Sequence, residues 1–307
     1  MIIRDKRPSG DVVKIGTRDT IEYLTFPALE QCRIVEHLFS TRLGGVSEGI
    51  WSSMNLGFQR GDEPKKVIEN YRRIAAIMHC EMEDFVCSHQ THTTNIRRVT
   101  IEDRGKGICR ERDYQDIDGL VTNDSGIVLV TYYADCVPLY FVDPENHAIG
   151  LAHSGWRGTV GEMGACMCRF MEREFGTRPK DLIVAIGPSI CRDCYEVSED
   201  VALEFEAILQ GTEDICLEIA QSGMFDKKVV HPVTPGKAPG KYQLDLWLSN
   251  VIVLRKAGVQ LSNISVADIC TCHNPEYLFS HRASHGQRGS LAAFLKLKGY
   301  ETEYLIC

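Results

Sequence analysis

Residues 127–158 are IVLVTYYADCVPLYFVDPENHAIGLAHSGWRG, and this stretch indicates the fold class. Three short apolar runs, 127–133, 139–142 and 148–151, are bounded by Gly, Pro or Asp, which is typical of buried strands. Helical patterns lie on both sides of these runs, and no sharp change of composition divides the chain. We therefore expect one large α/β or α+β domain over residues 1–307.

The segments outside this centre predict the other elements. Residues 11–26 are typical of a hairpin with its turn near Gly16-Thr17, and residues 35–40 of a strand that enters a glycine-rich loop. Apolar residues at helical spacing, with Pro64 in the first turn, predict a helix over 63–79. By the same criteria we expect helices over 159–175, 198–209, 244–256 and 290–297, strands over 85–87 and 182–186, and a polar loop over 221–241.

The composition excludes several classes of function. With 307 residues, 44% apolar and 25% charged, the chain is typical of a soluble globular protein. Its net charge of −8 gives no general attraction to nucleic acid or to an anionic membrane. There is no run of 18 apolar residues, and the opening MIIRDKRPSGD lacks the apolar centre of a signal peptide. The 13 cysteines then indicate reduced thiols, so we expect a cytoplasmic protein.

Three segments at predicted strand ends carry the residues best suited to chemistry. They are SHQTH at 88–92, YADCVP at 133–138 and AHSGWRG at 152–158. Together they offer His92, Cys136 and His153 as three ligands for zinc, with a fourth position left for water or substrate. His89 competes with His92, but residues three apart on an extended chain face opposite sides, so only one readily joins the site.

The same residues are compatible with a metal-free mechanism. Cys136 would then be a nucleophile and His153 its base, with Asp135 or Gln90 as a helper. The residue types do not separate a ligand from a nucleophile, because both roles need a thiolate beside an imidazole.

Other cysteines and arginines are further candidates. Cys191, Cys194, Cys270 and Cys272 form two close pairs in the sequence, which together would suit a second, structural zinc. A planar guanidinium grips phosphate through paired hydrogen bonds. The candidates for such a role at loop positions are Arg42, Arg157 and Arg282.

Ten segments in order give the chain a family resemblance. They are FSTRLGGVS, MNLG, Gly61-Asp62, Asn70, HQTH, DGLVT, ADCVP, AHSGWRGT, IGPSICRDCYEV and FSHR. The chain closely resembles the purine nucleoside phosphorylase family once described as multicopper polyphenol oxidases or laccase-domain proteins, whose members are also called peptidoglycan editing factors. The resemblance covers residues 34–298 and leaves the predicted hairpin within 1–33 as an extension.

The resemblance implies a fold and an activity. The implied fold is α+β, a four-layer α/β/β/α sandwich with mixed sheets, similar to cysteine hydrolases. The implied site binds one zinc through His92, Cys136 and His153. The implied reaction is phosphorolysis of adenosine, inosine, guanosine and methylthioadenosine, with adenosine deamination beside it. The small-molecule partners are then nucleosides and phosphate, and the protein is a monomer or a homodimer. Substrate or phosphate contacts are assigned to Arg42, Asn55, Gln90, Asp135, Arg157 and Arg282.

Some features separate this chain from the family pattern. Thr93 replaces a glycine that often follows the first ligand, and Cys191-Arg192-Asp193-Cys194 replaces Gly-Pro-Cys-Cys. The closing Gly-Arg signature is carried by Gln287-Arg288-Gly289, which leaves the role of Arg288 open. In the SGWRG segment we expect the glycines to permit a sharp turn and a helix start close to the metal.

Three alternative functions remain beside the phosphorylase. A copper oxidase of the laccase type is disfavoured, because the 10 histidines include no H-x-H pair. A cysteine hydrolase acting on a peptidoglycan precursor or another amide would use Cys136 without metal. A binding module for cell-wall or division processes would hold its ligand without turnover.

Overall fold

Two six-stranded mixed sheets form the centre of the computed structural model, which describes residues 2–5, 12–226 and 231–299. The first sheet contains, in spatial order, β1 (Lys14–Arg18), β2 (Ile21–Thr25), β3 (Val35–Ser40), β15 (Leu291–Leu297), β7 (Val128–Tyr133) and β4 (Phe85–Cys87). Only β4 and β7 are parallel in it.

The second sheet contains β14 (Ile264–Val266), β10 (Ile183–Ile186), β8 (Val137–Asp143), β9 (Ala148–Ser154), β6 (Gly119–Thr122) and β5 (Ile96–Arg98). Its outer pairs, β14 with β10 and β5 with β6, are parallel, and the pairs between them are antiparallel. The hairpin of β8 and β9 puts Pro138 opposite His153.

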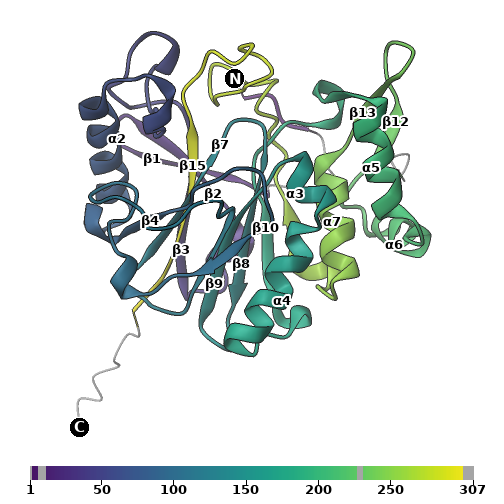
Figure 1. Cartoon of the computed structure of the whole chain (residues 1–307), viewed down its shortest axis with the longest axis horizontal. Coiled ribbons are helices and arrows are strands. Elements are labelled where there is room, and N and C mark those ends of the chain that lie inside the picture. Colours follow the sequence, from purple (N-terminus) through teal and green to yellow (C-terminus); the bar gives the residue numbers. More distant parts are fainter. Residues whose placement is uncertain (1, 6–11, 227–230, 300–307) are drawn as a thin grey trace.

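The described residues form seven α-helices. They are α1 (Pro27–Glu30), α2 (Pro64–Ile77), α3 (Trp156–Val160), α4 (Met163–Phe175), α5 (Glu199–Leu209), α6 (Glu213–Ser222) and α7 (Leu246–Lys256). A small antiparallel sheet, β11 (Glu196–Ser198), β13 (Lys241–Leu244) and β12 (Val233–Pro235), lies beside α5. Figure 1 shows α2 on one side of the molecule and α4 and α7 on the other.

Three apolar layers hold these elements together. Tyr71 and Ile74 of α2 pack on Phe294 of the first sheet, and Met167 of α4 packs on the outer face of the second sheet. Between the sheets lies a third layer, in which Leu129 and Leu151 are fully buried. The order of layers is therefore helix, sheet, sheet, helix, and the expected four-layer sandwich with mixed sheets is confirmed.

One predicted helix is a strand. Residues 290–297 are mostly β15, Leu291–Leu297, which is paired on both sides, with β3 and with β7. Leu, Ala and Lys favour a helix locally, but an apolar run buried on both faces suits a central strand equally well. Burial in the middle of the sandwich outweighed the local preference.

Several other boundaries also differ. The first hairpin turns at Asp19-Thr20 rather than at Gly16-Thr17, and residue 11 lies outside the described part. The helix expected over 159–175 is divided at Glu162, whose φ is +54°, into α3 and α4. The loop expected over 221–241 contains the end of α6, strand β12 and the first residue of β13 in its described part. No helix in the described ranges is both long enough and apolar enough to cross a membrane.

Candidate functional site

His92, Cys136 and His153 come together from three different elements. Cys136 lies on the crossing from β7 in the first sheet to β8 in the second. His153 lies near the end of β9, and His92 lies in the loop after β4, where its φ is +66°. One ligand atom from each of the three lies within 4.8 Å of the other two. The structure thus brings together a possible metal-binding group.

The side chains are already arranged as a donor set. The Sγ of Cys136 is 4.0 Å from Nε2 of His92, and the ring centroids of His92 and His153 are 5.0 Å apart. His89 also lines the adjacent cavity, but its Nδ1 accepts a hydrogen bond from the amide of Asp116. His92 is therefore the histidine of this segment that joins the cluster.

Asp118 organises two of these donors. Its carboxylate lies 2.8 Å from Nδ1 of His153, which leaves Nε2 of that ring for a metal. The same carboxylate accepts the backbone N–H groups of Thr91, His92 and Thr93. Burial alone would raise the pKa of Asp118, but the bond from His153 holds it below its usual value. No sequence pattern predicts this role for Asp118, although it begins the DGLVT segment of the family resemblance.

Electrostatics favours a thiolate at Cys136. Burial alone would raise the pKa of this thiol, but the charge of His153 and hydrogen bonds from both histidines lower it to about 6. Burial would in turn lower the pKa of His153, yet the Cys136 thiolate and Asp118 raise it to about 9. The thiolate is the form that binds a metal and the form that attacks an electrophile.

A cavity of about 640 Å³ opens onto the cluster. It is lined by aromatic side chains, among them Tyr132 and Tyr133, and by arginines that include Arg60 and Arg288. Burial, and repulsion from Arg60, lower the pKa of Arg288 to about 10. Its Nε is buried and has no hydrogen-bond partner within the described ranges. Two neighbouring guanidinium groups, one half-buried and one exposed, attract an anion.

The arginines selected from the sequence are bonded elsewhere. Arg42 donates to the carbonyls of Ser52 and Pro275 and lies over Phe279. Arg282 donates to two backbone carbonyls, and the exposed Arg157 lies over Trp156. None of the three is among the residues that line the cavity in the described chain.

Of the other three residues assigned to substrate or phosphate, one lines the cavity and two are hydrogen-bonded within the fold. Gln90 lines the cavity and is fixed by hydrogen bonds to both the N–H and the carbonyl of Tyr132. Asp135 is buried and accepts from the hydroxyl of Thr271 and the backbone N–H of Arg282. Asn55 is fully buried, and its side chain is bonded within the fold. Only Gln90 of these three faces the cavity; the roles assigned to all six residues remain predictions.

Gly155 of the SGWRG segment permits a close approach of side chains rather than the expected sharp turn. Gly155 has an ordinary extended conformation, with a φ of −70°. A Cβ there would lie 2.8 Å from Sγ of Cys136 and 3.2 Å from the ring of His92. At Gly158 the nearest atom to such a Cβ is 3.4 Å away. Gly155 therefore leaves space for the ligand cluster.

Comparison with known proteins places this geometry in a family. The family model described as Multi-copper polyphenol oxidoreductase laccase matches residues 36–298. The purine nucleoside phosphorylase YlmD of Bacillus subtilis is 33% identical over 264 residues, which cover 85% of this chain and 87% of that protein. Adenosine deaminase RL5, from an unknown prokaryotic organism, is 30% identical over 249 residues, which cover 80% and 87%.

Solved structures agree with the sequence comparison. The crystal structure of YlmD from Geobacillus stearothermophilus matches with a TM-score of 0.80 and 32% identity, over 94% of this chain and 100% of that chain. The Bacillus licheniformis protein YfiH matches with a TM-score of 0.82 and 31% identity, over 92% and 99%. By sequence and by fold, the chain therefore belongs to the multicopper polyphenol oxidoreductase laccase family, whose similar curated members include purine nucleoside phosphorylases.

Proposed function

We propose that this protein is a zinc-dependent purine nucleoside phosphorylase that acts on adenosine, inosine, guanosine and methylthioadenosine, with adenosine deamination as a second activity. The observation that carries the proposal is the convergence of His92, Cys136 and His153 beside a cavity that is also lined by two arginines. Relatives named for both activities support it.

The donor set fits zinc. Two imidazoles and a thiolate are ligands of a kind zinc accepts, and three protein ligands are typical of catalytic zinc. The hydrogen bond from His153 to Asp118 is the outer contact that metal-bound histidines usually make. When bound, zinc supplies Lewis acidity and lowers the pKa of water. The copper in the family's description is disfavoured here, because blue-copper sites add a weak axial ligand and laccase chemistry needs several coppers.

Arg288 and Arg60 are the residues we assign to phosphate. In phosphorolysis a phosphate oxygen forms a bond to C1′ of the ribose while the bond from C1′ to the purine nitrogen breaks. The purine leaves with the electron pair and takes up a proton. The half-buried guanidinium of Arg288 and the exposed one of Arg60 would hold the phosphate in place for this attack and balance its charge.

The aromatic walls suit the base. Purines present flat faces, which stack on aromatic side chains such as Tyr132 and Tyr133. The hydroxyl of Tyr133 donates to the carbonyl of Ala152, so this ring has a fixed position. In deamination at the same site, the oxygen of a water molecule would form a bond to C6 while the bond from C6 to the amino nitrogen breaks, which gives inosine and ammonia.

Chromatography of adenosine incubated with the zinc-loaded protein tests the proposal. We expect adenine and ribose 1-phosphate only when phosphate is present, and inosine to a smaller extent without it. His153→Ala should abolish both products. If neither adenine nor inosine forms from adenosine under either condition, the nucleoside assignment is wrong.

Two arginine variants separate the possible phosphate sites. Arg288→Met should raise the KM for phosphate at least tenfold with little change in the KM for adenosine, because one charged contact to an anion contributes about 1.5–3 kcal/mol. Arg157→Ala should leave the phosphate dependence unchanged. The reverse pattern would move the phosphate site to the segment after β9.

A cysteine hydrolase is the second candidate, favoured by one observation. Cys136, His153 and Asp118 are linked in the order of a nucleophile, a base and an orienting carboxylate. Such an enzyme would keep its activity on an amide substrate in the presence of a chelator and lose it on alkylation. The phosphorylase would lose its activity with the chelator and recover it with zinc.

We also propose that the protein is located in the cytoplasm. Every described cysteine carries a free thiol, which supports the expected cytoplasmic location, where thiols stay reduced.

A further inference from the structure

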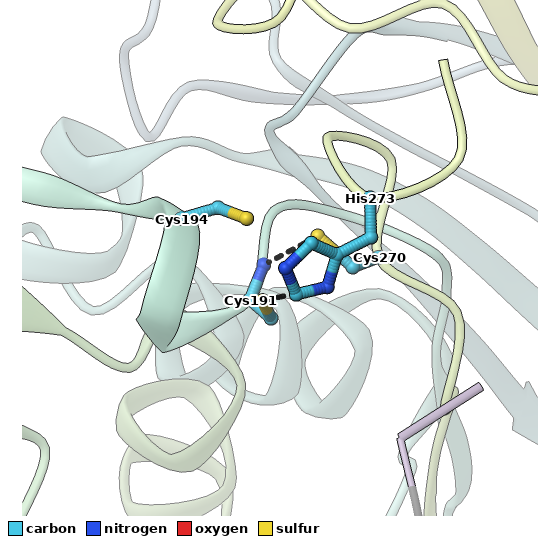
Figure 2. A group of neighbouring side chains, drawn as sticks. All are labelled: Cys191, Cys194, Cys270 and His273. Carbon is cyan, nitrogen blue, oxygen red and sulfur yellow. Dashed lines mark hydrogen bonds between the residues drawn. The ribbon is translucent and has the colours of Figure 1, made fainter. Parts of the chain in front are cut away.

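Cys191, Cys194, Cys270 and His273 form a second group of metal-type side chains. Cys191 precedes and Cys194 ends a single 3-10 turn, Arg192–Cys194, between β10 and β11. Cys270 and His273 lie in the segment after β14. Figure 2 shows the four side chains pointing toward one another from these two segments. The sequence suggested Cys272 as the fourth member; the structure groups His273 with the other three cysteines, and the thiol of Cys272 lies beside that of Cys194.

The distances suit one tetrahedral ion. One ligand atom from each of the four residues lies within 4.8 Å of every other. Sγ of Cys191 is 3.8 Å from Nδ1 of His273, and the N–H of Cys191 donates to Sγ of Cys270 at 3.3 Å. Around a tetrahedral zinc with bonds of about 2.0–2.3 Å, the donors lie about 3.5–3.8 Å apart. Only small side-chain movements are needed to reach that geometry.

We propose that these four residues bind one structural zinc ion. Three thiolates and one imidazole form a common closed set, in which four protein ligands leave no position for a substrate. Cys191 and Cys270 are buried, as structural ligands usually are. None of the four is among the described residues that line the cavity. The proposal is therefore independent of the proposed activity.

The topology explains why the two segments meet. β10 and β14 are adjacent parallel strands, so the chain leaves both at the same edge of the sheet. The pairing continues past the strands, because Ser189 bridges to Cys270 and accepts the N–H of Thr271 at 3.1 Å. An ion there would hold two otherwise irregular segments side by side.

This ion would also stabilise the position of Asp135, next to the candidate active site. Thr271, next to Cys270, donates its hydroxyl to Asp135 at 2.6 Å, and Asp135 precedes Cys136. Arg282 donates its guanidinium to the carbonyl of Cys194 and its backbone N–H to Asp135. Both segments of the zinc group are therefore connected by hydrogen bonds, directly or through Arg282, to Asp135, which precedes Cys136. We assign the four ligands a positioning role rather than a catalytic one.

The metal content of three variants tests the proposal. The double variant His92→Ala/His153→Ala removes the cavity donors and should retain one zinc per chain, whereas the wild type binds two. His273→Ala should lose the second equivalent. Cys216→Ser, a half-buried thiol in α6 outside both groups, should have the zinc content of the wild type. If the double variant is folded and binds no metal, the proposal is overturned.

Cobalt substitution identifies the ligands without relying on the folding of a cysteine variant. Co²⁺ in the double variant should give the strong thiolate charge-transfer absorption of a three-sulfur tetrahedral site. Absorption of a single-thiolate site, or none, would contradict the assignment, as would a disulfide between any two of Cys191, Cys194 and Cys270 in freshly isolated protein. If the cavity site held no metal, wild type and double variant would each bind one zinc, so failure of the proposed function is distinguishable.

Discussion

At the scale of single residues, Asp118 positions two of the three cavity donors, because its carboxylate bonds to the ring of His153 and to the backbone N–H of His92. His92, Cys136 and His153 are rare residue types at strand ends, and such positions expose side chains from a fixed backbone. Asp118 was missed because its role depends on a long-range contact, in which one carboxylate accepts the N–H groups of the loop 91–93 and a ring nitrogen of His153. No local pattern marks such an acceptor.

Replacing Asp118 tests this supporting role. Asp118→Asn keeps the size of the side chain but removes its charge and places a donor against backbone N–H groups. We expect zinc affinity at the cavity site to fall about 10–100-fold, as measured by competition with a chromogenic chelator. Asp116→Asn, on the exposed side of the same loop, is the matched control and should not change the affinity. Equal affinities in all three proteins would exclude the role.

His37 gives the fold a dependence on pH. Its buried Nε2 accepts the N–H of Phe26 at 2.8 Å, and burial lowers its pKa from 6.5 to about 4. The unfolded chain therefore binds a proton more readily than the folded one, and stability falls as pH decreases from about 6.5 to about 4. From pH 7 to pH 5 this residue should lower the free energy of unfolding by about 2 kcal/mol.

Urea unfolding of His37→Gln isolates that contribution. The variant is less stable at pH 7 because it loses a fitted ring. However, its stability should change less between pH 7 and pH 5 than that of the wild type, so the two values converge. Loss of metal in acid affects both proteins and cancels in the comparison. Parallel pH dependences would show that His37 is not the responsible group.

At the scale of elements, the sequence predicted the helices and strands that have a clear hydrophobic periodicity. It did not predict those whose conformation depends on burial in the sandwich. The helix expected over 63–79 is α2, Pro64–Ile77, and the strands around Cys136 are present. The residues of strand β15 favour a helix in the sequence, because their alanines and leucines carry no alternation. Helix α6 and strand β12 were missed within or beside a segment rich in Gly and Pro, where turn signals dominate the local pattern.

The junction of β9 and α3 gives a sharp test of close approach. Gly155→Ala places a methyl group 2.8 Å from Sγ of Cys136, so one ligand must move. We expect the variant to fold and to lose most of its zinc affinity at the cavity site. Gly158→Ala, three residues later in the same short helix, meets nothing closer than 3.4 Å and should bind zinc as the wild type does. Metal analysis and melting temperature distinguish the two variants, and equal zinc binding in both would contradict the argument.

At the scale of the whole molecule, the layered architecture was expected from the family resemblance rather than from the residues. Residue patterns indicated only a mixture of strands and helices, because they do not state which strands pair or how sheets stack. The chain changes sheets repeatedly, so strands distant in sequence such as β3 and β15 become neighbours. The similarity to cysteine hydrolases in fold stays a prediction.

The shared layer between the sheets predicts cooperative unfolding. Since Leu129 of one sheet and Leu151 of the other are buried in the same cluster, neither sheet keeps a complete core alone. We expect a single urea transition with coincident midpoints by tryptophan fluorescence and far-UV circular dichroism, as one domain requires. Two separated transitions would divide the chain into two domains.

The crossing at residues 134–136 has a consequence for how the molecule responds to force. The three cavity donors come from both sheets and from the link between them. His92 follows β4 of the first sheet, His153 lies near the end of β9 in the second, and Cys136 lies on the link. Any sliding or compression of one sheet against the other must change the triangle these donors form. The geometry of the three cavity donors therefore depends on the relative position of the two sheets. A cobalt ion bound there would report, by a shift in its visible spectrum under hydrostatic pressure, strain distributed over the whole sandwich before any part of it unfolds.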